Sequence, residues 1–406
     1  MPDFARSDDP AVRAQLERLS LLSPGGDRLG LDRITRLLDR LGRPQDSLPP
    51  VFHVAGTNGK GSTCAFLRAA LEASGHTVHA FTSPHLVRFN ERIRVAGKLI
   101  ADLALSALLT EVLDASGDIE PSFFEVTTAV AFLAFARTPA DAAVIEVGLG
   151  GRLDATNVVE RPVATGIAAL GIDHQQFLGQ SLVEIAEEKA GIAKRDVPLV
   201  VLSQSAEAED AILRTAEAAG ARVLLEGRDW SIDPTLRSSL LGDHQIRNAN
   251  LAWQMLQAQA RLAVGRTSFL SGLSSTQWPA RFQRLADGPL TQGLETWVDG
   301  AHNLEAARAL AQLLADHGPK HIVLGILANK DASAIIAELA PHALSLTFVP
   351  VPDHDHHDPA GLAGRFNVRA ASSLEMALSD LPAPRLIAGS LYLAGEALRL
   401  NGQAPD

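Results

Sequence analysis

The sequence predicts an α/β protein made of two units, each with a mostly parallel β-sheet covered by helices. Short apolar runs alternate with longer amphipathic stretches along most of the 406 residues. This alternation is typical of β-α-β units. A turn-rich stretch, ADGPLTQG at 286–293, interrupts the alternation, which then resumes. We therefore expect a larger unit over residues 1–285 and a smaller one over 286–406.

The elements of the larger unit follow from periodicity. Leu and Ile recur at three- and four-residue spacing over 9–22 and 31–42, which predicts two helices joined by the loop SPGGDRLG. Apolar runs predict strands at 51–55, 78–81, 142–147, 163–169 and 198–202. Amphipathic stretches predict helices at 62–74, 101–115, 123–136, 204–222, 248–263 and 267–274. Residues 223–247 are less regular, and we expect some β-structure there.

The smaller unit repeats the pattern. Apolar runs predict strands at 295–298, 321–327, 344–349 and 385–388, with helices between them.

Composition excludes several classes of protein. The net charge of -11 and the pI of about 5.6 argue against a nucleic-acid partner, which needs a basic face. No apolar run approaches the roughly 20 residues of a membrane span, and the first residues lack the basic and apolar regions of a signal peptide. Cys64 is the only cysteine, which suits a reducing compartment. We expect a cytoplasmic monomer without membrane or nucleic-acid partners.

The glycine loop VFHVAGTNGKGS, residues 51–62, is the strongest indication of function. Glycines between a strand and a helix allow several backbone N–H groups to point at one anion, and the helix N-terminus adds its dipole. Lys60 can reach a terminal phosphate, and Ser62 can face a magnesium ion. The spacing differs from the common G-x-x-x-x-G-K-[ST] loop. The alternative is a glycine-rich turn that binds nothing.

Other strand ends also carry reactive side chains. Glu146 closes an apolar run before a glycine-rich loop, where a metal would explain a carboxylate; loop capping is the alternative. Asp173 and His174 follow the run 163–169, at the edge where open α/β sheets bind ligands. By itself, His174 fits a structural role equally well. Lys189 follows two glutamates in a helical stretch, a pattern typical of a solvated helix face.

In the smaller unit, the segment WVDGAHN places Asp299 at a strand end and His302 at the start of a helix. Helix capping is the structural alternative for such residues. The cluster PDHDHHDP at 352–359 resembles a metal site, but we expect a solvent-exposed loop.

Ten segments resemble one known family. They are LGLDRI (29–34), HVAGTNGKGS (53–62), SPHLVRFNERI (83–93), FFE (123–125), EVGLGGRLDATN (146–157), DHQQFLG (173–179), EKAGI (188–192), PARFQ (279–283), DGAHN (299–303) and GSLYL (389–393). Together they resemble the bacterial folylpolyglutamate synthase/dihydrofolate synthase family of the Mur-ligase superfamily. The sequence departs from that family at Asn329, where an acidic residue is expected, and at Gly300, where Val or Ala is commoner.

The resemblance implies a fold and an activity. An N-terminal P-loop ATPase domain would bind ATP and the pterin, and a Rossmann-like C-terminal domain would serve glutamate ligation. The implied reaction joins L-glutamate to dihydropteroate, or to the γ-carboxylate of a reduced folate, through an acyl phosphate, with ATP and Mg²⁺. Three alternatives remain: a Mur-type ligase for another carboxylate, a nucleotide switch, and a non-catalytic remnant. Whether one or both ligase activities are present stays open.

The resemblance also implies roles for individual residues. The implied catalytic residues are Lys60, His302 and Lys189. The implied nucleotide contacts are Thr57, Asn58, Gly59, Lys60, Gly61, Ser62, Asn248, Arg281 and Asp299. The implied pterin-side residues are Leu29, Gly30, Leu31, Phe123, Phe124, Arg152 and Asp154. The implied magnesium ligands are Ser83, Glu146, His174 and, if it is carbamylated, Lys189.

Overall fold

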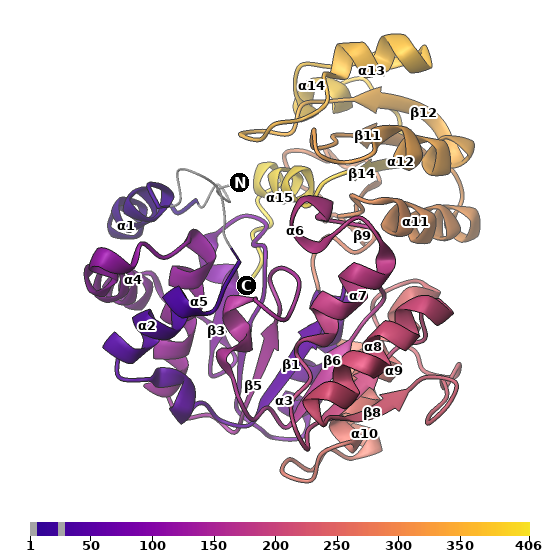
Figure 1. The fold of residues 1–406 in the computed structure, drawn as a ribbon. Helices are drawn as coiled ribbons and strands as arrows, with labels where there is room; N and C mark the ends of the chain where they lie inside the picture. The colour runs from indigo at the N-terminus through magenta and orange to yellow at the C-terminus, as the bar shows by residue number, and fades with distance from the viewer. Residues whose placement is uncertain (1–5, 23–28) are drawn as a thin grey trace.

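Two α/β units stacked on one another form the protein (Figure 1). The structure is a computed structural model, and it describes residues 6–22 and 29–406. The larger N-terminal unit lies below in the figure, and the smaller C-terminal unit, in orange and yellow, lies above it. The predicted loop at 23–30 lies outside the described residues except for Leu29 and Gly30.

The sheet of the N-terminal unit has eight strands in the order β4-β3-β2-β5-β1-β6-β7-β8. Their bounds are β1 (Val51–Ala55), β2 (Val78–Phe81), β3 (Ile93–Val95), β4 (Lys98–Leu99), β5 (Ala142–Glu146), β6 (Ala164–Ile167), β7 (Pro198–Val201) and β8 (Arg222–Leu225). The six strands from β2 to β8 in this order run parallel, and β3 and β4 add an antiparallel edge. The parallel arrangement places the carboxyl ends of β2, β5, β1 and β6 side by side, which is the edge where open α/β sheets bind ligands.

Helices cover both faces of this sheet. Their bounds are α1 (Pro10–Ser20), α2 (Asp32–Arg40), α3 (Lys60–Ala73), α4 (Asp102–Ser116), α5 (Phe123–Ala136), α6 (Gln175–Leu178), α7 (Leu182–Ala190), α8 (Ala206–Ala219), α9 (Asp243–Gln257) and α10 (Arg266–Ser275). Short 3-10 turns include η4 (Ala155–Val158). Ser122 and Glu125 form a capping box that starts α5.

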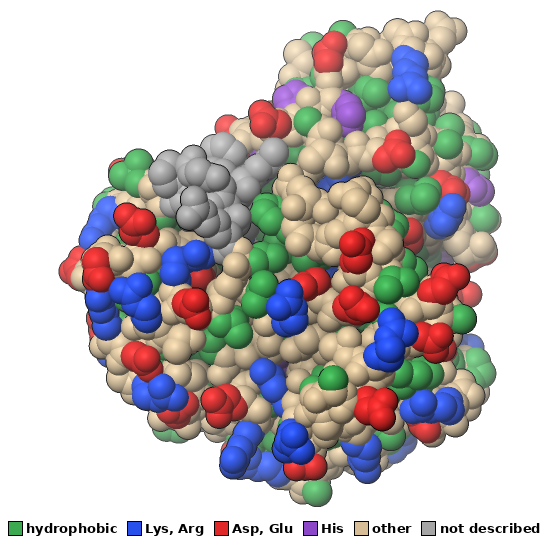
Figure 2. Space-filling view, viewed as in Figure 1, with side chains coloured by type: hydrophobic (Ala, Val, Ile, Leu, Met, Phe, Trp, Pro, Cys, Tyr) green, Lys and Arg blue, Asp and Glu red, His purple; other side chains and the backbone are tan. Residues whose placement is uncertain are grey.

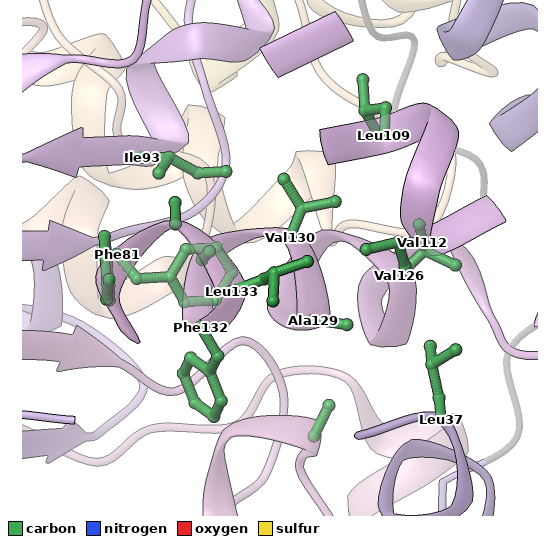
Figure 3. Packing of buried hydrophobic residues seen from close by; sticks show 14 of the residues in the cluster. Leu37, Phe81, Ile93, Leu109, Val112, Val126, Ala129, Val130, Phe132 and Leu133 are labelled. Atoms are coloured by element: carbon green, nitrogen blue, oxygen red, sulfur yellow. The ribbon is translucent and has the colours of Figure 1, made fainter. Parts of the chain in front are cut away.

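The largest hydrophobic core of the N-terminal unit surrounds α5. Side chains from α5, among them Val126, Val130 and Phe132, pack against Phe81 and Ile93 of the sheet (Figure 3). Because α5 is almost entirely buried and a capping box closes its first turn, its N-terminus is held in place. Phe123 and Phe124, at that N-terminus, are therefore fixed relative to the sheet.

The C-terminal unit has a six-stranded sheet in the order β13-β12-β11-β14-β10-β9. Its strands are β9 (Gln283–Arg284), β10 (Thr296–Val298), β11 (Lys320–Leu324), β12 (Ala343–Phe348), β13 (Arg369–Ala370) and β14 (Arg385–Ala388). Its helices are α11 (Leu304–His317), α12 (Ala332–Leu339), α13 (Pro359–Phe366), α14 (Leu374–Leu378) and α15 (Leu391–Leu400). β9 pairs antiparallel with β10, so this sheet starts just before the proposed division at 285/286.

The predicted fold class is confirmed, and most predicted elements are found. Two helix starts were wrong. The helix after the glycine loop begins at Lys60 rather than Ser62, because Gly59 takes a left-handed conformation (φ 88°) and completes the turn. The helix predicted at 248–263 spans Asp243–Gln257, because Gly242 (φ 102°) starts it and the Gln259 side chain binds the Leu256 carbonyl at its end.

Candidate active site

The glycine loop connects the end of β1 to the N-terminus of α3. The N–H groups of Thr57 and Asn58 donate to the Ala169 carbonyl at 2.9 and 3.1 Å, which ties the loop to the end of β6. The first N–H groups of α3 have no carbonyl within their own helix to bind. The candidate anion-binding end of the loop is therefore Gly59 to Ser62, while Thr57 and Asn58 hold the loop in place.

Two lysines converge on one carbonyl of this loop. Lys60 Nζ and Lys189 Nζ each lie 3.0 Å from the Gly56 carbonyl oxygen. Lys189 is 5% exposed. Burial, followed by the charge of Lys60, lowers the pKa of Lys189 to about 7. The solvated helix face that the local pattern favours is not found for Lys189, because its amine lies inside the site. With a pKa of about 7, roughly half of this amine is neutral at neutral pH.

Glu146 lies at the end of β5, beside the glycine loop. The side chain is 4% exposed, and Oε2 accepts the Ser83 N–H at 3.1 Å. Burial raises the pKa of Glu146, although Lys60, the Ser83 N–H and Arg281 oppose this shift. A buried carboxylate with only one hydrogen-bonded partner in the described residues is suited to a hard cation.

The donor set fits a magnesium ion that keeps other ligands. Among the described residues no group of three or more His, Cys, Asp or Glu side chains could hold a metal. Glu146 and Ser83 provide oxygen donors, and His174 lines the same cavity with its side chain 46% exposed. Magnesium characteristically binds one or two protein carboxylates together with water and substrate phosphates.

Asp173, in the loop between β6 and α6, connects the two units. It forms an ion pair with Lys330, and it accepts the Asn303 amide N–H at 3.2 Å. His302 Nε2 lies 3.8 Å from its carboxylate. Burial opposes ionisation, but His174, Lys330 and His302 outweigh it and hold the pKa of Asp173 well below its usual range.

The same junction includes the glycine loop itself. The side-chain amides of Asn58 and Asn303 donate to each other at 3.2 and 3.1 Å, so the cap of α11 is bonded to the loop. His302 Nδ1 donates to the Gly300 carbonyl at 2.8 Å, which leaves Nε2 as an acceptor. Burial lowers the pKa of His302 to about 4, so this imidazole is neutral at physiological pH.

Arg281 and Asp299 lie between the units. Asp299 accepts the N–H groups of Phe282 and Ala301 at 2.7 and 2.8 Å. Asp299 therefore holds the backbone at Phe282 and Ala301 in place. The residue that caps α11 is Asn303. Packing explains the glycine at position 300. A Cβ atom there would lie 2.4 Å from Leu391 Cδ2 and 2.7 Å from Arg281 Nη1.

Two cavities meet beside the glycine loop. One, of about 340 Å³, is lined by Lys60, Phe123, Phe124, Asp154 and His302, among others. The other, of about 790 Å³, extends along α3 to Trp278 and the Arg68 and Arg94 side chains. They share the following lining residues: Gly61, Ser83, Pro84, Glu146, Arg281 and Leu391. The candidate phosphate and metal positions thus lie between two spaces.

Comparison with known proteins identifies the family. No model of a protein family matches the chain. The folylpolyglutamate synthase of Lacticaseibacillus casei is 35% identical, with 89% of this chain and 92% of the relative covered. The dihydrofolate synthase/folylpolyglutamate synthase of Bacillus subtilis is 36% identical, covering 80% and 81%. The chain belongs to this synthase family. A crystal structure of the bifunctional Yersinia pestis synthase with AMPPNP and a Mn ion superposes with a TM-score of 0.86, at 28% identity, covering 98% and 99%.

Most of the predicted site residues of this synthase-family chain line the smaller cavity. These are Leu29, Gly30, Thr57, Asn58, Gly59, Lys60, Gly61, Ser83, Phe123, Phe124, Glu146, Asp154, His174, Lys189, Arg281 and His302. Five predicted residues line neither cavity: Leu31, Ser62, Arg152, Asn248 and Asp299. Arg152 instead pairs with Glu188, and Asn248 packs against Gly59, where a Cβ would meet its Oδ1 at 2.3 Å. Their assigned roles stay predictions.

Lys330 is a site residue that sequence reasoning missed. Its ammonium lies in the smaller cavity on the C-terminal side, with 9% of the side chain exposed. The segment LANKD was noted only for its neighbour Asn329. A lysine in the loop that follows the apolar run 321–327 was the available indication.

The loop at 352–359 was predicted to be solvent-exposed, which holds for Asp353, Asp355 and Asp358 but not for its histidines. His354 stacks on Tyr392 with ring centroids 3.7 Å apart, and both line the smaller cavity. His357 Nε2 donates to the Lys330 carbonyl at 2.8 Å. The loop pairs with residues 327–330, so its histidines support the segment that carries Lys330 and are half-buried.

Proposed function

We propose that this protein carries out both reactions named for its family, ligating L-glutamate to dihydropteroate and to the γ-carboxylate of reduced folates. The observation that carries this proposal is the smaller cavity. There an aromatic, half-buried wall, a phosphate-binding loop and a cationic C-terminal wall face one another. These are the three surfaces that a pterin carboxylate, ATP and glutamate require.

We place the acceptor at the aromatic wall. Phe123 and Phe124 begin α5, and both line the cavity. A ring edge or face there would pack on the bicyclic pterin. The Gly148 backbone lies so near Phe124 that a Cβ would meet the ring at 2.3 Å. The pocket is therefore closed at that side, and the acceptor carboxylate would extend toward Lys60.

Phosphoryl transfer activates this carboxylate. An acceptor oxygen attacks the γ-phosphorus, the bond to ADP breaks, and an acyl phosphate forms. Lys60 and the N–H groups at the start of α3 would bind the phosphate oxygens as charge develops on them. Glu146, Ser83 and His174 would hold the divalent ion, which neutralises phosphate charge when it is bound. Catalysis here is mostly positioning and electrostatics.

The amide forms in the second step. The amine of glutamate attacks the acyl carbon, and phosphate leaves with the C–O bond electrons. Neutral His302 and the Asp173 carboxylate offer acceptors for the amine protons, and Lys330 offers a cation for a glutamate carboxylate. Because these three groups come from both units, a closed arrangement would exclude water from the acyl phosphate.

We propose that Lys189 is carbamylated and serves the metal in that form. Only a neutral amine attacks carbon dioxide, and burial lowers the pKa of Lys189 to about 7. We expect a carbamate signal in the carbon NMR spectrum of protein kept in ¹³C-bicarbonate, and its absence in Lys189→Ala. The Ala variant should lose roughly a hundredfold in kcat, and acetate should restore part of it. No difference between the two spectra would contradict the assignment.

Purified protein tests the function directly. We expect ATP, Mg²⁺ and labelled glutamate to give labelled product with dihydropteroate and, separately, with tetrahydrofolate. Product with only one acceptor would reduce the proposal to one activity. Phosphate release that needs neither acceptor nor glutamate would indicate a nucleotide switch. Release that needs glutamate and another carboxylate would indicate a different Mur-type ligase.

We further propose that the protein works in the cytoplasm as a monomer, with small molecules as its partners. Within the described residues, no helix has the length and apolar character needed to cross a bilayer. On the face shown in Figure 2, Lys and Arg side chains are interspersed with Asp and Glu rather than gathered into a basic patch.

A further inference from the structure

A histidine is buried in β1, next to the turn that lines the acceptor cavity. His53 lies in the middle of β1 and is 0% exposed. Side chains alternate along a strand. His53 therefore lies on the same face as Val51, which packs in the core around α5. Phe52 and Val54 face the opposite core. An imidazole at such a position replaces what would otherwise be an aliphatic core residue.

One hydrogen bond connects this ring to the acceptor pocket. His53 Nε2 lies 2.8 Å from Thr156 Oγ1. The Thr156 hydroxyl donates its single hydrogen to the Asp154 carboxylate. The hydrogen between the histidine and the threonine must therefore belong to His53 Nε2. Burial, followed by the charge of Lys194, lowers the pKa of His53 to about 3, so the ring is neutral and carries this one N–H.

The other ring nitrogen shows that packing alone does not explain the histidine. Nδ1 is buried and has no hydrogen-bond partner within the described residues. An unpartnered buried polar atom is rare and unfavourable. A leucine would avoid this cost. The hydrogen bond from Nε2 to Thr156 therefore explains why a histidine occupies this position.

Asp154, which accepts the Thr156 hydroxyl, holds the turn that lines the pocket. Its Oδ1 also accepts the Thr156 N–H at 2.9 Å, and its Oδ2 accepts the Leu149 N–H at 2.8 Å. Asp154 is 2% exposed and spans the turn between β5 and η4. Residues of this turn line the smaller cavity: Gly148, Leu149, Gly150, Leu153, Asp154 and Ala155. The carboxylate thus closes the turn on itself.

We propose that His53 is a positioning residue for the acceptor: through Thr156 and Asp154 it fixes the Gly148–Ala155 turn against which the pterin carboxylate substrate binds. This inference rests on the proposed function, because that function places the acceptor in this cavity. Within the described part of the chain, the side chains of His53, Thr156 and Asp154 make no hydrogen bond to the nucleotide loop. Loss of this relay should therefore weaken acceptor binding and leave nucleotide binding unchanged.

Binding measurements with the full-length protein test the relay. We expect His53→Leu and Thr156→Val each to weaken dihydropteroate binding about tenfold, as measured by fluorescence titration, since a hydrogen bond that supports a charged group is lost. The dissociation constant of ADP should change less than about twofold. The double variant should bind no more weakly than either single variant, because both changes break the same chain. His53→Gln and Thr156→Ser keep the donors and should restore binding.

His79→Leu is the matched control. His79 is also a fully buried strand histidine, in β2, but its Nε2 binds the Thr138 carbonyl at 3.0 Å, away from the cavity. This control should lower the unfolding temperature without changing dihydropteroate binding. If His53→Leu does not fold, the comparison of dihydropteroate binding by Thr156→Val and Thr156→Ser tests the inference instead.

Two results would overturn the inference alone: dihydropteroate binding that is unchanged in the variants while the wild type binds, or weakening that is equal for dihydropteroate and ADP. A wild-type protein that binds no dihydropteroate would overturn the proposed function and this inference with it.

Discussion

Replacing Lys60 by alanine should reduce ATP-dependent ligation roughly a thousandfold in kcat/KM, because the variant loses the cation nearest the transferring phosphoryl group. Among the described residues, the Lys60 ammonium binds only the Gly56 and Thr57 carbonyls, at 3.0 and 3.3 Å. It is therefore held at the loop and is free to exchange these neutral partners for phosphate oxygens. Phosphate release that depends on glutamate and acceptor measures the effect.

The fold of the Lys60→Ala variant should survive. Lys60 is half-buried and forms no ion pair among the described contacts, and alanine is a good helix former at the start of α3. Lys98→Ala removes the same charge from an exposed position in β4 and should leave turnover unchanged. Near-normal turnover in Lys60→Ala, with an unchanged circular dichroism spectrum, would rule out the phosphate role.

Replacing Glu146 by glutamine should shift the magnesium requirement at least about a hundredfold to higher concentration. Glutamine keeps the shape and the acceptor for the Ser83 N–H, but it removes the buried charge that fits a hard cation. Manganese binding followed by electron paramagnetic resonance measures the loss independently of turnover. His174→Ala should shift the requirement less, because this side chain is 46% exposed and a nitrogen donor suits magnesium poorly.

Glu111→Gln is the matched control for Glu146. Glu111 is exposed on α4 and pairs with Arg137, so its neutralisation should leave the metal titration unchanged. The same magnesium titration for Glu146→Gln and wild type would exclude Glu146 as a ligand. A loss of activity with unchanged manganese binding would assign Glu146 a role with the substrate.

Local patterns in the sequence determined the elements and several site residues. The strand 51–55 was predicted to the residue, and the glycine loop was found from spacing alone, because apolar periodicity and glycine placement are local properties. Glu146 was recognised as a candidate because it ends an apolar run, and parallel strand ends share one edge. His174 follows another such run, but its assignment as a metal ligand came from the resemblance. The folate acceptor came from resemblance, since no spacing rule encodes a pterin.

Tertiary structure decided which distant residues meet. Asp173 and Lys330 are 157 positions apart, and their pairing depends on how the second sheet sits above the first. The same packing turned His354 onto Tyr392 and buried Lys189 beside Lys60, although their local sequences are typical of exposed segments. His53 lies in a motif that was interpreted through its glycines. Only the tertiary contact between β1 and η4 shows that its Nε2 reaches Thr156. Secondary structure follows from short-range sequence, whereas burial, pKa and contacts depend on which surfaces the assembled sheets bring together.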